Sequence, residues 1–360
     1  MILLTGVTGF VGGALAAELI GAGHSVAALV RAENECAARA RVATSLARFT
    51  DHAAARSAAE AMGVVVGDLA ASGTYQHELF DRAGYVVHAA GCTSFAPKSE
   101  VWRSNVDGTA QLAKRVVRSP ALRRFLYVGT AYCCGSRPAP VVHEDDAPRR
   151  EHQHVNEYAR SKAAAELLLA ELSFGERLLV ARPSIVVGHT RLGVAPSSSL
   201  FWYCRAMAAL RQGPFELEDA RDIVPVDYVA KALAFLLFAE SARARTYHVS
   251  AGRVSSRTLR EMLLALGWRE TDGWHKTSAR ALGSLRPQLR PFVNSELEAR
   301  QLSSALGACA RFGEIGVQCF DNTRLLAEGF PAPPSFAEYA HVCVKSSGTA
   351  SLFEQMVDDA

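Results

Sequence analysis

The chain has 360 residues, of which 49% are hydrophobic and 21% are charged, and its net charge is +3 with histidine counted as neutral. This length is enough for one large α/β domain or two smaller ones, and the composition is ordinary for a globular protein. The small net charge and the lack of Lys/Arg runs argue against nucleic acid as a partner.

The first residues predict a buried strand, a glycine-rich turn and a helix. MILLT at 1–5 is a short apolar run, and a helical segment at 10–22 follows the turn. No Lys or Arg precedes Arg31, so the basic start of a signal peptide is missing. Glycines and Glu18 interrupt the run, and the apolar stretch at 232–239 is too short, so we expect no membrane span and a cytoplasmic location.

Strands and helices then alternate as far as residue 252. This pattern predicts an α/β fold, a Rossmann-type doubly wound parallel sheet with helices on both faces. Further strands are expected at 25–30, 63–69, 84–91, 123–132, 177–188 and 246–252, with helices at 34–61, 99–117 and 157–173, and a strand followed by a helix at 222–240.

The regular alternation of predicted strands and helices ends after residue 188. Residues 190–221 have no clear period, while 255–268 read as a helix with a serine N-cap. We therefore predict a cofactor-binding Rossmann domain at 1–189 plus 222–252. A smaller mixed C-terminal lobe at 190–221 plus 253–360 is predicted to bind the substrate.

The glycines of TGVTGFVG follow a strand and open a helix, which is the arrangement of a dinucleotide site. Gly6 allows the tight turn, Gly9 lets the backbone approach a pyrophosphate, and Gly12 lets helix and strand pack closely. The helix N-terminus offers free N–H groups to the phosphates.

The end of the second predicted strand indicates which dinucleotide binds. An acidic residue there favours NAD, whereas this chain has Arg31 and no acid before Glu33. A guanidinium fits a 2′-phosphate, so NADPH is the predicted cofactor. Asp68, after the third strand, is placed to accept a hydrogen bond from the adenine amino group, although it also fits a structural role.

Tyr158 and Lys162 lie four residues apart on one predicted helix and so share a face. A nearby ammonium would lower the pKa of the phenol and make it a usable acid at neutral pH. Thr130 lies at the carboxyl end of the fifth predicted strand, at the sheet edge where α/β folds bind ligands. Its hydroxyl can hold a substrate oxygen beside the phenol.

The motifs TGVTGFVG, GDL, HAAG, NVDGT, YVGTAY, YARSK and ARPSIVVG occur in the order of the extended short-chain dehydrogenase/reductases, which the chain resembles over about residues 1–250. Within that superfamily it is most similar to the thioester reductase and fatty acyl-CoA reductase branch, whose NAD-binding domain is of the male-sterility type. The stretches at 28–49, 86–109 and 222–233 carry this narrower match, and TYHVSAG adds to it.

The resemblance implies roles for individual residues. Thr130 and Tyr158 would polarise the substrate oxygen, and Lys162 would bond the nicotinamide ribose and tune the phenol. Asn105 would brace the strand–helix unit. The implied cofactor-binding set is Gly6, Thr8, Gly9, Phe10, Val11, Gly12, Arg31, Asp68, Leu69, Ala89, Lys162, Pro183 and Ile185.

The implied reaction is NADPH-dependent reduction of an acyl thioester to an aldehyde, with a second reduction to the alcohol left open. Many thioester reductases end a long synthetase, whereas this chain begins at its first strand. We therefore expect an acyl thioester delivered in trans on CoA or on a separate carrier protein. A homodimer is a family habit, and the acyl group and the role of residues beyond about 255 stay open.

Three alternatives keep the same core motifs. The first is reduction or oxidation of another carbonyl or alcohol, as in hydroxysteroid dehydrogenases. The second is nucleotide-sugar chemistry, as in epimerases or dehydratases. The third is a non-catalytic NADP sensor. A sensor is disfavoured because the Tyr/Lys pair is present.

Several residues read as structural or as surface groups. The eight cysteines form no C-x-x-C pair, which favours reduced thiols and no metal site, and neither Cys133 nor Cys134 is expected to be a nucleophile. His88 follows a buried strand and is expected to be structural. LFWYC at 200–204 fits core better than an acyl tunnel, and Lys276, Arg280, Arg286 and Arg290 fit a solvated face better than a docking site.

Overall fold

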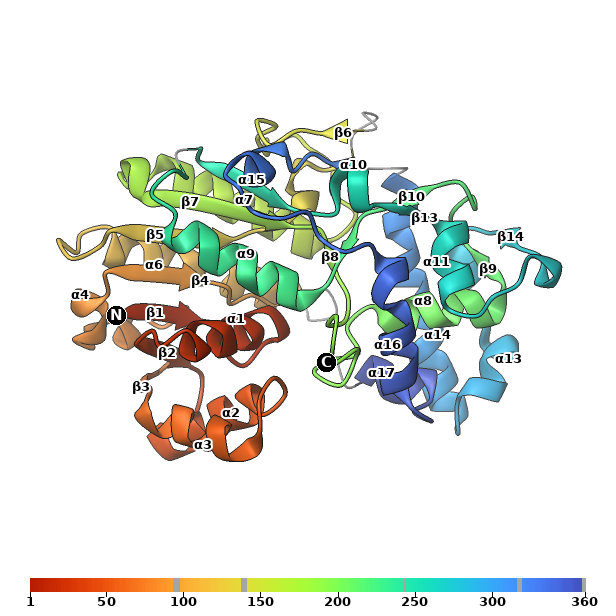
Figure 1. The fold of residues 1–360 in the computed structure, drawn as a ribbon, viewed down its shortest axis with the longest axis horizontal. Helices are drawn as coiled ribbons and strands as arrows, with labels where there is room; N and C mark the ends of the chain where they lie inside the picture. The colour runs from red at the N-terminus through yellow and green to blue at the C-terminus, as the bar shows by residue number, and fades with distance from the viewer. Residues whose placement is uncertain (93–97, 137–140, 243, 316–318, 358–360) are drawn as a thin grey trace.

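The computed structural model describes residues 1–92, 98–136, 141–242, 244–315 and 319–357. A seven-stranded sheet in the order β12-β7-β5-β4-β1-β2-β3 forms its centre, and every neighbouring pair is parallel (Figure 1). This confirms the predicted Rossmann-type α/β fold. The strands are β1 (Ile2–Thr5), β2 (Val26–Val30), β3 (Gly63–Val66), β4 (Tyr85–His88), β5 (Arg124–Val128), β7 (Leu178–Pro183) and β12 (Thr246–Val249).

Helices cover both faces of the sheet, because successive strand side chains point to opposite sides. In β1, Ile2 and Leu4 join one apolar cluster and Leu3 joins the other. The first face carries α1 (Phe10–Gly21), α2 (Glu35–Leu46), α3 (His52–Ala61) and α9 (Val226–Phe238). The second face carries α4 (Leu79–Arg82), α6 (Gly108–Val116) and α7 (Glu157–Glu171).

A group of helices lies beside the carboxyl-end side of the sheet (Figure 1). It is built around its own apolar clusters, which include Trp202, Leu306 and Phe336. Its main helices are α8 (Phe201–Leu210), α11 (Leu259–Ala265), α14 (Glu296–Ala310), α16 (Phe336–Ser347) and α17 (Leu352–Val357). The predicted division into two domains is compatible with these separate clusters, and we retain it as a proposal.

Short elements connect these layers. The short strands are β6 (Val141–Val142), β8 (Ile185–Val186), β9 (Gln212–Gly213), β10 (Ala220–Arg221), β11 (Ile223–Val224), β13 (Arg257–Thr258), β14 (His275–Lys276) and β15 (Cys319–Phe320). The short helices are α5 (Lys98–Trp102), α10 (Gly252–Ser255), α12 (Ala279–Leu282), α13 (Arg286–Leu289) and α15 (Thr323–Ala327). Further turns are η1 (Ser72–Gln76), η2 (Arg103–Asp107), η3 (Ala131–Cys134), η4 (Gly175–Arg177), η5 (Glu270–Asp272), η6 (Arg290–Phe292) and η7 (Arg311–Ile315).

The single helix predicted at 34–61 is wrong, because two N-caps divide it. Asn34 accepts a hydrogen bond from Ala37 N and starts α2, and Asp51 accepts one from Ala54 N and starts α3. A side chain that caps a new helix satisfies free N–H groups that a continuous helix would have paired internally.

Three other boundaries differ from the sequence prediction. The stretch at 190–221 contains α8, whose apolar residues are buried on several sides and so show no simple period. The N-cap of α11 is Thr258, which forms a capping box with Glu261, rather than a serine. The strand expected at 177–188 is split into β7 and β8, and β8 pairs with β11 instead of continuing in the main sheet.

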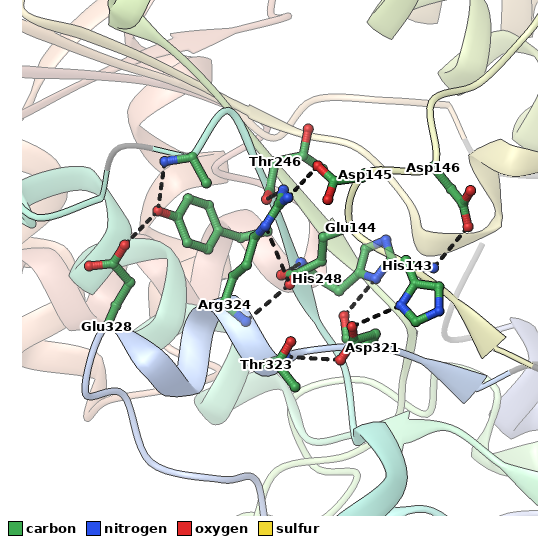
Figure 2. A network of polar contacts seen from close by, with 12 residues as sticks. His143, Glu144, Asp145, Asp146, Thr246, His248, Asp321, Thr323, Arg324 and Glu328 are labelled. Atoms are coloured by element: carbon green, nitrogen blue, oxygen red, sulfur yellow. Dashed lines mark hydrogen bonds and ion pairs between the residues drawn. The ribbon is translucent and has the colours of Figure 1, made fainter.

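A late segment of the chain returns to the edge of the main sheet (Figure 2). Strand β15 pairs with β6, and Leu325 of α15 joins the apolar cluster of the sheet. The buried carboxylate of Glu144 accepts hydrogen bonds from His248 N of β12 at 2.8 Å and from Arg324 N at 3.0 Å. Because one carboxylate serves both backbones, Glu144 fastens this segment to strand β12.

The pH dependence of stability tests this role of Glu144. Burial raises the pKa of Glu144 from 4.5 to about 7, against the opposing effect of its hydrogen bonds. A carboxyl whose pKa is raised on folding gives stability that is fully present below its unfolded pKa and is lost as the pH rises through its folded pKa. Between pH 4.5 and 8, we expect the free energy of unfolding of the wild type to fall by on the order of 3 kcal/mol relative to that of Glu144→Gln.

Urea unfolding of both proteins at several pH values measures this difference. The comparison cancels the other buried groups, because Asp222, His88 and His248 are unchanged in the variant. Parallel pH profiles for the two proteins would show that Glu144 does not titrate in this range.

Candidate active site

The first and third glycines of the opening turn are required by the protein's own packing. Gly6 has φ +82°, and a Cβ there would lie 2.6 Å from Ala90 N. A Cβ on Gly12 would overlap the carbonyl oxygen of Gly6. Gly9 differs, because the nearest atom to a Cβ there is Gly6 O, at an ordinary 3.4 Å. The space over Gly9 is therefore left open on the side away from the turn.

The N-terminus of α1 suits a pyrophosphate. Gly9 is the N-cap, and no side chain caps the helix. The first N–H groups of the helix, which belong to Phe10, Val11 and Gly12, have no partner within the helix. Thr8 is partly exposed beside them. These residues fit the phosphates of a dinucleotide, as the sequence predicted, and the binding role stays a prediction.

The opposite end of the site carries charge at the ends of β2 and β3. Arg31 is exposed directly after β2. The Asp68 carboxylate accepts a hydrogen bond from Ala70 N at 2.8 Å and forms an ion pair with Arg103 at 2.9 Å. Burial opposes ionisation, but Ala70, Arg103 and Arg31 together hold the pKa of Asp68 below its ordinary value. An ionised Asp68 can accept a hydrogen bond from an amino group.

Two arginines of this region were missed by the sequence analysis. Arg103 pairs with Asp68, and Arg41 of α2 donates to the carbonyl of Arg31. No local motif distinguishes either residue, since the first contact spans 35 residues of the chain and the second joins α2 to the end of β2. Leu69 lies against Gly108 of α6, and Ala89 N donates to Thr5 O at 3.2 Å, so these predicted positions also line this edge of the sheet.

Helix α7 presents Tyr158 and Lys162 to the end of strand β5. Asn156 caps the helix by accepting from Ala159 N at 2.8 Å. The buried Lys162 Nζ donates to Val128 O at 2.8 Å, two residues before Thr130. Thr130 is 6% exposed, and its Oγ1 accepts from Tyr132 N at 3.3 Å. Its hydroxyl hydrogen can still be donated to another oxygen.

Burial sets the pKa values of this pair. It raises the pKa of Tyr158 to about 12 and lowers that of Lys162 to about 8. We expected Lys162 to lower the pKa of the phenol, and this expectation is wrong for the cofactor-free structure, where the ammonium is bonded to a backbone carbonyl. At neutral pH Tyr158 is therefore a protonated donor and Lys162 is mostly charged.

The buried side chain of Asn105 links two elements beneath the site. Asn105, in the π-helical turn η2, donates to Cys92 O at 3.0 Å and to Ser161 Oγ at 2.9 Å, and it accepts from Cys92 N at 2.7 Å. It thus joins the end of β4 to helix α7. Residues 93–97 of the family-like stretch at 86–109 lie outside the described residues.

His88 is a structural residue, as predicted. It lies between Thr5 Oγ1 at 2.7 Å and Thr109 Oγ1 at 2.8 Å. Burial, with the charge of Lys162, lowers the pKa of His88 to about 3. The imidazole is therefore neutral and joins β1, β4 and α6 without taking part in proton transfer at neutral pH.

A buried ion pair holds α7 against β7. The Arg182 guanidinium binds the Glu166 carboxylate, with Nε at 3.1 Å from Oε2, and Nη1 donates to Asp146 O at 2.9 Å. Pro183 follows Arg182 at the buried end of β7, and Ile185 is partly exposed in β8. These are the two positions predicted to lie behind a nicotinamide.

All eight cysteines are free thiols, and the contact of Cys134 with Cys133 lowers the pKa of the Cys134 thiol. Burial raises the pKa of Cys133, and Cys134 Sγ is bonded to Asp146 O at 3.0 Å. Within the described ranges, no group of three or more His, Cys, Asp or Glu side chains could hold a metal ion. Among the same residues, no helix is long and apolar enough to cross a membrane.

The structure places the aromatic stretch at 200–204 in the core and the four basic residues of the sequence analysis on the surface. Phe201 and Trp202 of LFWYC are buried in apolar clusters, which supports their interpretation as core. Lys276 pairs with Glu216 at 2.8 Å on the surface. Arg280, Arg286 and Arg290 are exposed. The basic residues therefore form a solvated face, the interpretation that the sequence favoured over a docking site.

The sequence matches the model of the NAD-binding family described as Male sterility protein over residues 4–233. Among curated proteins, an aldehyde reductase of Aspergillus flavus is 28% identical over 69% of this chain and 26% of its own length. A non-canonical nonribosomal peptide synthetase of Cladobotryum is 27% identical over 69% of this chain and 26% of its own length. The L-2-aminoadipate reductase large subunit of Eremothecium gossypii is 26% identical over 76% of this chain and 22% of its own length. The chain thus spans about a quarter of the length of these relatives.

Solved structures support the fold. The terminal R domain of the myxalamid PKS-NRPS pathway aligns with a TM-score of 0.77 at 23% identity, covering 96% of this chain and 90% of that one. A thiolation-reductase di-domain of an archaeal nonribosomal peptide synthetase aligns with a TM-score of 0.73 at 18% identity, covering 96% and 74%. A UDP-glucose 4-epimerase of Thermus thermophilus, complexed with NAD, aligns with a TM-score of 0.59 at 20% identity, covering 97% and 99%.

Two alanine substitutions separate the packing and binding roles of the glycines. We expect Gly12→Ala to destabilise the fold by more than about 2 kcal/mol, because its Cβ overlaps backbone. Gly9→Ala has room, so its melting temperature should stay near wild type while the Kd for a nicotinamide dinucleotide rises about 10- to 100-fold. Calorimetric titration and thermal unfolding measure both effects. Wild-type affinity in Gly9→Ala would exclude a phosphate from this turn.

Proposed function

The chain belongs to the male sterility family of NAD-binding proteins within the extended short-chain dehydrogenase/reductases, and from this we propose that it reduces an acyl thioester to an aldehyde with NADPH. The observation that carries the proposal is Thr130 together with Tyr158 and Lys162 at one sheet edge. They stand in a chain whose curated relatives include an aldehyde reductase, an aminoadipate reductase and a peptide synthetase. The family consists of NAD(P)-dependent oxidoreductases.

NADPH is proposed over NADH because of the charges at the ends of β2 and β3. Arg31 is exposed there, and Arg41 and Arg103 lie beside it through their contacts with the Arg31 carbonyl and with Asp68. A guanidinium binds a phosphate through charge-assisted hydrogen bonds that a ribose hydroxyl cannot match. When bound, NADPH supplies a hydride to the carbonyl carbon of the thioester.

The chain's own residues stabilise the oxygen of that carbonyl. Thr130 and the protonated Tyr158 are the two hydroxyl donors at the end of β5. Stabilisation of a developing oxyanion by fixed donors is the largest contribution in many such sites. Tyr158 gives its proton to the oxygen, and Lys162 keeps a positive charge beside the phenol as that proton leaves. Collapse of the resulting hemithioacetal releases the aldehyde and the thiol, so one hydride and one proton are consumed.

Delivery of the thioester on a phosphopantetheine arm is the proposal for the partner. CoA and carrier proteins share this arm, so both can present the same thioester. The relatives that are peptide synthetases favour a carrier protein, and the solved thiolation-reductase di-domain has the same fold. The exposed arginines of α12 and α13 are the proposed contact with an acidic carrier.

Replacement of Arg31 tests the choice of cofactor. We expect Arg31→Ala to raise the Kd for NADPH about 10- to 100-fold, since it removes a charge-assisted phosphate contact, and to change the Kd for NADH by less than about threefold. Fluorescence titration of both cofactors gives the ratio. Arg118→Ala, which removes an exposed arginine on the other face of the sheet, is the matched control. Equal losses for NADPH and NADH would contradict a 2′-phosphate contact.

Replacement of Tyr158 tests the reaction. Product analysis with NADPH and a panel of acyl-CoA and acyl-carrier thioesters should show aldehyde and free thiol in equal amounts. Tyr158→Phe should lower kcat about 100- to 10,000-fold by removing the proton donor, with the NADPH Kd unchanged. An unchanged kcat would remove Tyr158 from the mechanism. If no thioester of the panel causes NADPH to be oxidised, the proposed activity is refuted.

A further inference from the structure

A cluster of buried polar side chains lies next to the candidate catalytic residues, and the proposed mechanism does not use it. It consists of Arg221 on β10, Tyr203 on α8 and Tyr132 on η3. Tyr132 comes two residues after Thr130, and its N–H donates to the Thr130 hydroxyl at 3.3 Å. The cluster therefore begins at the catalytic loop and extends toward the helices beside the sheet.

Arg221 is a buried cation held at one position. Its side chain is 12% exposed, and its guanidinium carbon lies 3.7 Å from the ring centroid of Phe215. Nη2 forms an ion pair with Asp219 Oδ2 at 3.1 Å. Nevertheless, Nε and Nη2 are buried and make no hydrogen bond of normal geometry to a described residue. Burial lowers the pKa of Arg221, whereas Asp219, Tyr132 and Tyr203 raise it.

Tyr203 places a second unused donor beside this cation. Tyr203 is 7% exposed, and its buried hydroxyl has no hydrogen-bond partner within the described part of the chain. The charge of Arg221 acts on the phenols of both Tyr203 and Tyr132 and favours their ionised forms, although burial outweighs it and raises both pKa values. Phe215, against which Arg221 packs, belongs to the same apolar cluster as Tyr203, so Arg221 and Tyr203 lie in one region of the structure.

Unpaired buried donors are costly, and folded proteins rarely leave them without a partner. An arginine N–H can only donate, so what the cluster lacks is an acceptor. The rest of the surroundings is aromatic. Tyr132 packs edge-on against Phe312 at 5.3 Å and Phe320 at 5.0 Å between ring centroids. An aromatic setting with a few converging donors selects a ligand with one polar group on an apolar chain.

We propose that Arg221 and Tyr203 form the acyl-recognition site, which binds an oxygen acceptor, a carboxylate or an amide carbonyl, on the acyl chain away from the thioester. This inference rests on the proposed function and names its substrate class. The enzyme then prefers polar acyl groups to plain fatty acyl groups. A chain without the acceptor leaves both donors unpaired, which sites of this kind discriminate against strongly.

Matched thioesters test the proposal in the full chain with NADPH. Butyryl-, valeryl- and hexanoyl-CoA are compared with succinyl-, glutaryl- and adipoyl-CoA, and with the corresponding ω-amides. We expect kcat/KM to be at least about tenfold higher for an acceptor-bearing thioester than for its methyl-ended counterpart. The carboxylate and amide series distinguish the two sources of the acceptor. Equal kcat/KM values at every length would overturn the proposal.

Substitutions at both positions connect the preference to these residues. Arg221→Met and Tyr203→Phe should each bring the ratio of kcat/KM values toward one, and Arg221→Lys should keep part of it. Arg260→Met is the control, since Arg260 forms exposed ion pairs with Glu218 and Glu270 near the same helices. A lower melting temperature with an unchanged ratio in both variants would make the cluster purely structural and overturn the inference.

Failure of the proposed activity is distinguishable from failure of this inference. If all thioesters are reduced without preference, the activity stands and the acyl-recognition site does not. If none is reduced, calorimetric titration still tests the acyl-recognition site. Adipoyl-CoA and hexanoyl-CoA are titrated into the NADPH-saturated wild type and into NADPH-saturated Arg221→Met. Tighter binding of adipoyl-CoA that is lost in the variant supports the site, and equal binding of the two refutes it.

Discussion

The hydrogen bond from the Lys162 ammonium to the Val128 carbonyl fixes the geometry on which the candidate site depends. It joins the middle of α7 to the end of β5 at 2.8 Å, in a place where both groups are buried. A buried ammonium is stable only when it is paired or hydrogen-bonded, so the helix cannot slide along the sheet without leaving a charge unsatisfied. Tyr158, one turn earlier on α7, takes its position from this contact.

Buried polar groups reinforce that contact from three sides. Asn105 joins α7 to the end of β4 through Ser161. The Arg182–Glu166 pair fastens the next turn of α7 to β7. His88, kept neutral by burial, joins β1 to α6. Each of these contacts is satisfied within the protein, so these groups hold the scaffold, whereas the Tyr158 phenol and the Thr130 hydroxyl can still donate to a ligand.

The contrast between satisfied and unsatisfied groups also separates scaffold from recognition. Glu144 and Asp222 are buried carboxylates with several backbone donors each, and they fasten the late segment of the chain to the sheet. Arg221 and Tyr203 are less completely buried, and they keep buried donor atoms without a hydrogen-bond partner among the described residues. The first group explains how the C-terminal part closes on the sheet, and the second points to where a substrate contributes the missing acceptor.

The sequence by itself determined the parallel sheet, the glycine turn and the placement of Tyr158 and Lys162 one turn apart on α7. These features depend on local order, because apolar runs, a strand–turn–helix and a four-residue helical spacing are readable without distant contacts. It also identified His88 as structural. The break between α2 and α3 was missed, since helical composition outweighed the caps at Asn34 and Asp51.

Only the tertiary structure decided the electrostatics. The pKa of Tyr158 is raised and not lowered, because burial and the direction of the Lys162 ammonium are properties of the packed site. Arg103 and its partner Asp68 lie 35 residues apart in the chain, and Arg221 and Tyr203 lie on different elements, β10 and α8. Their proximity is set by how the sheet edge and the C-terminal helices pack, and no local pattern encodes that.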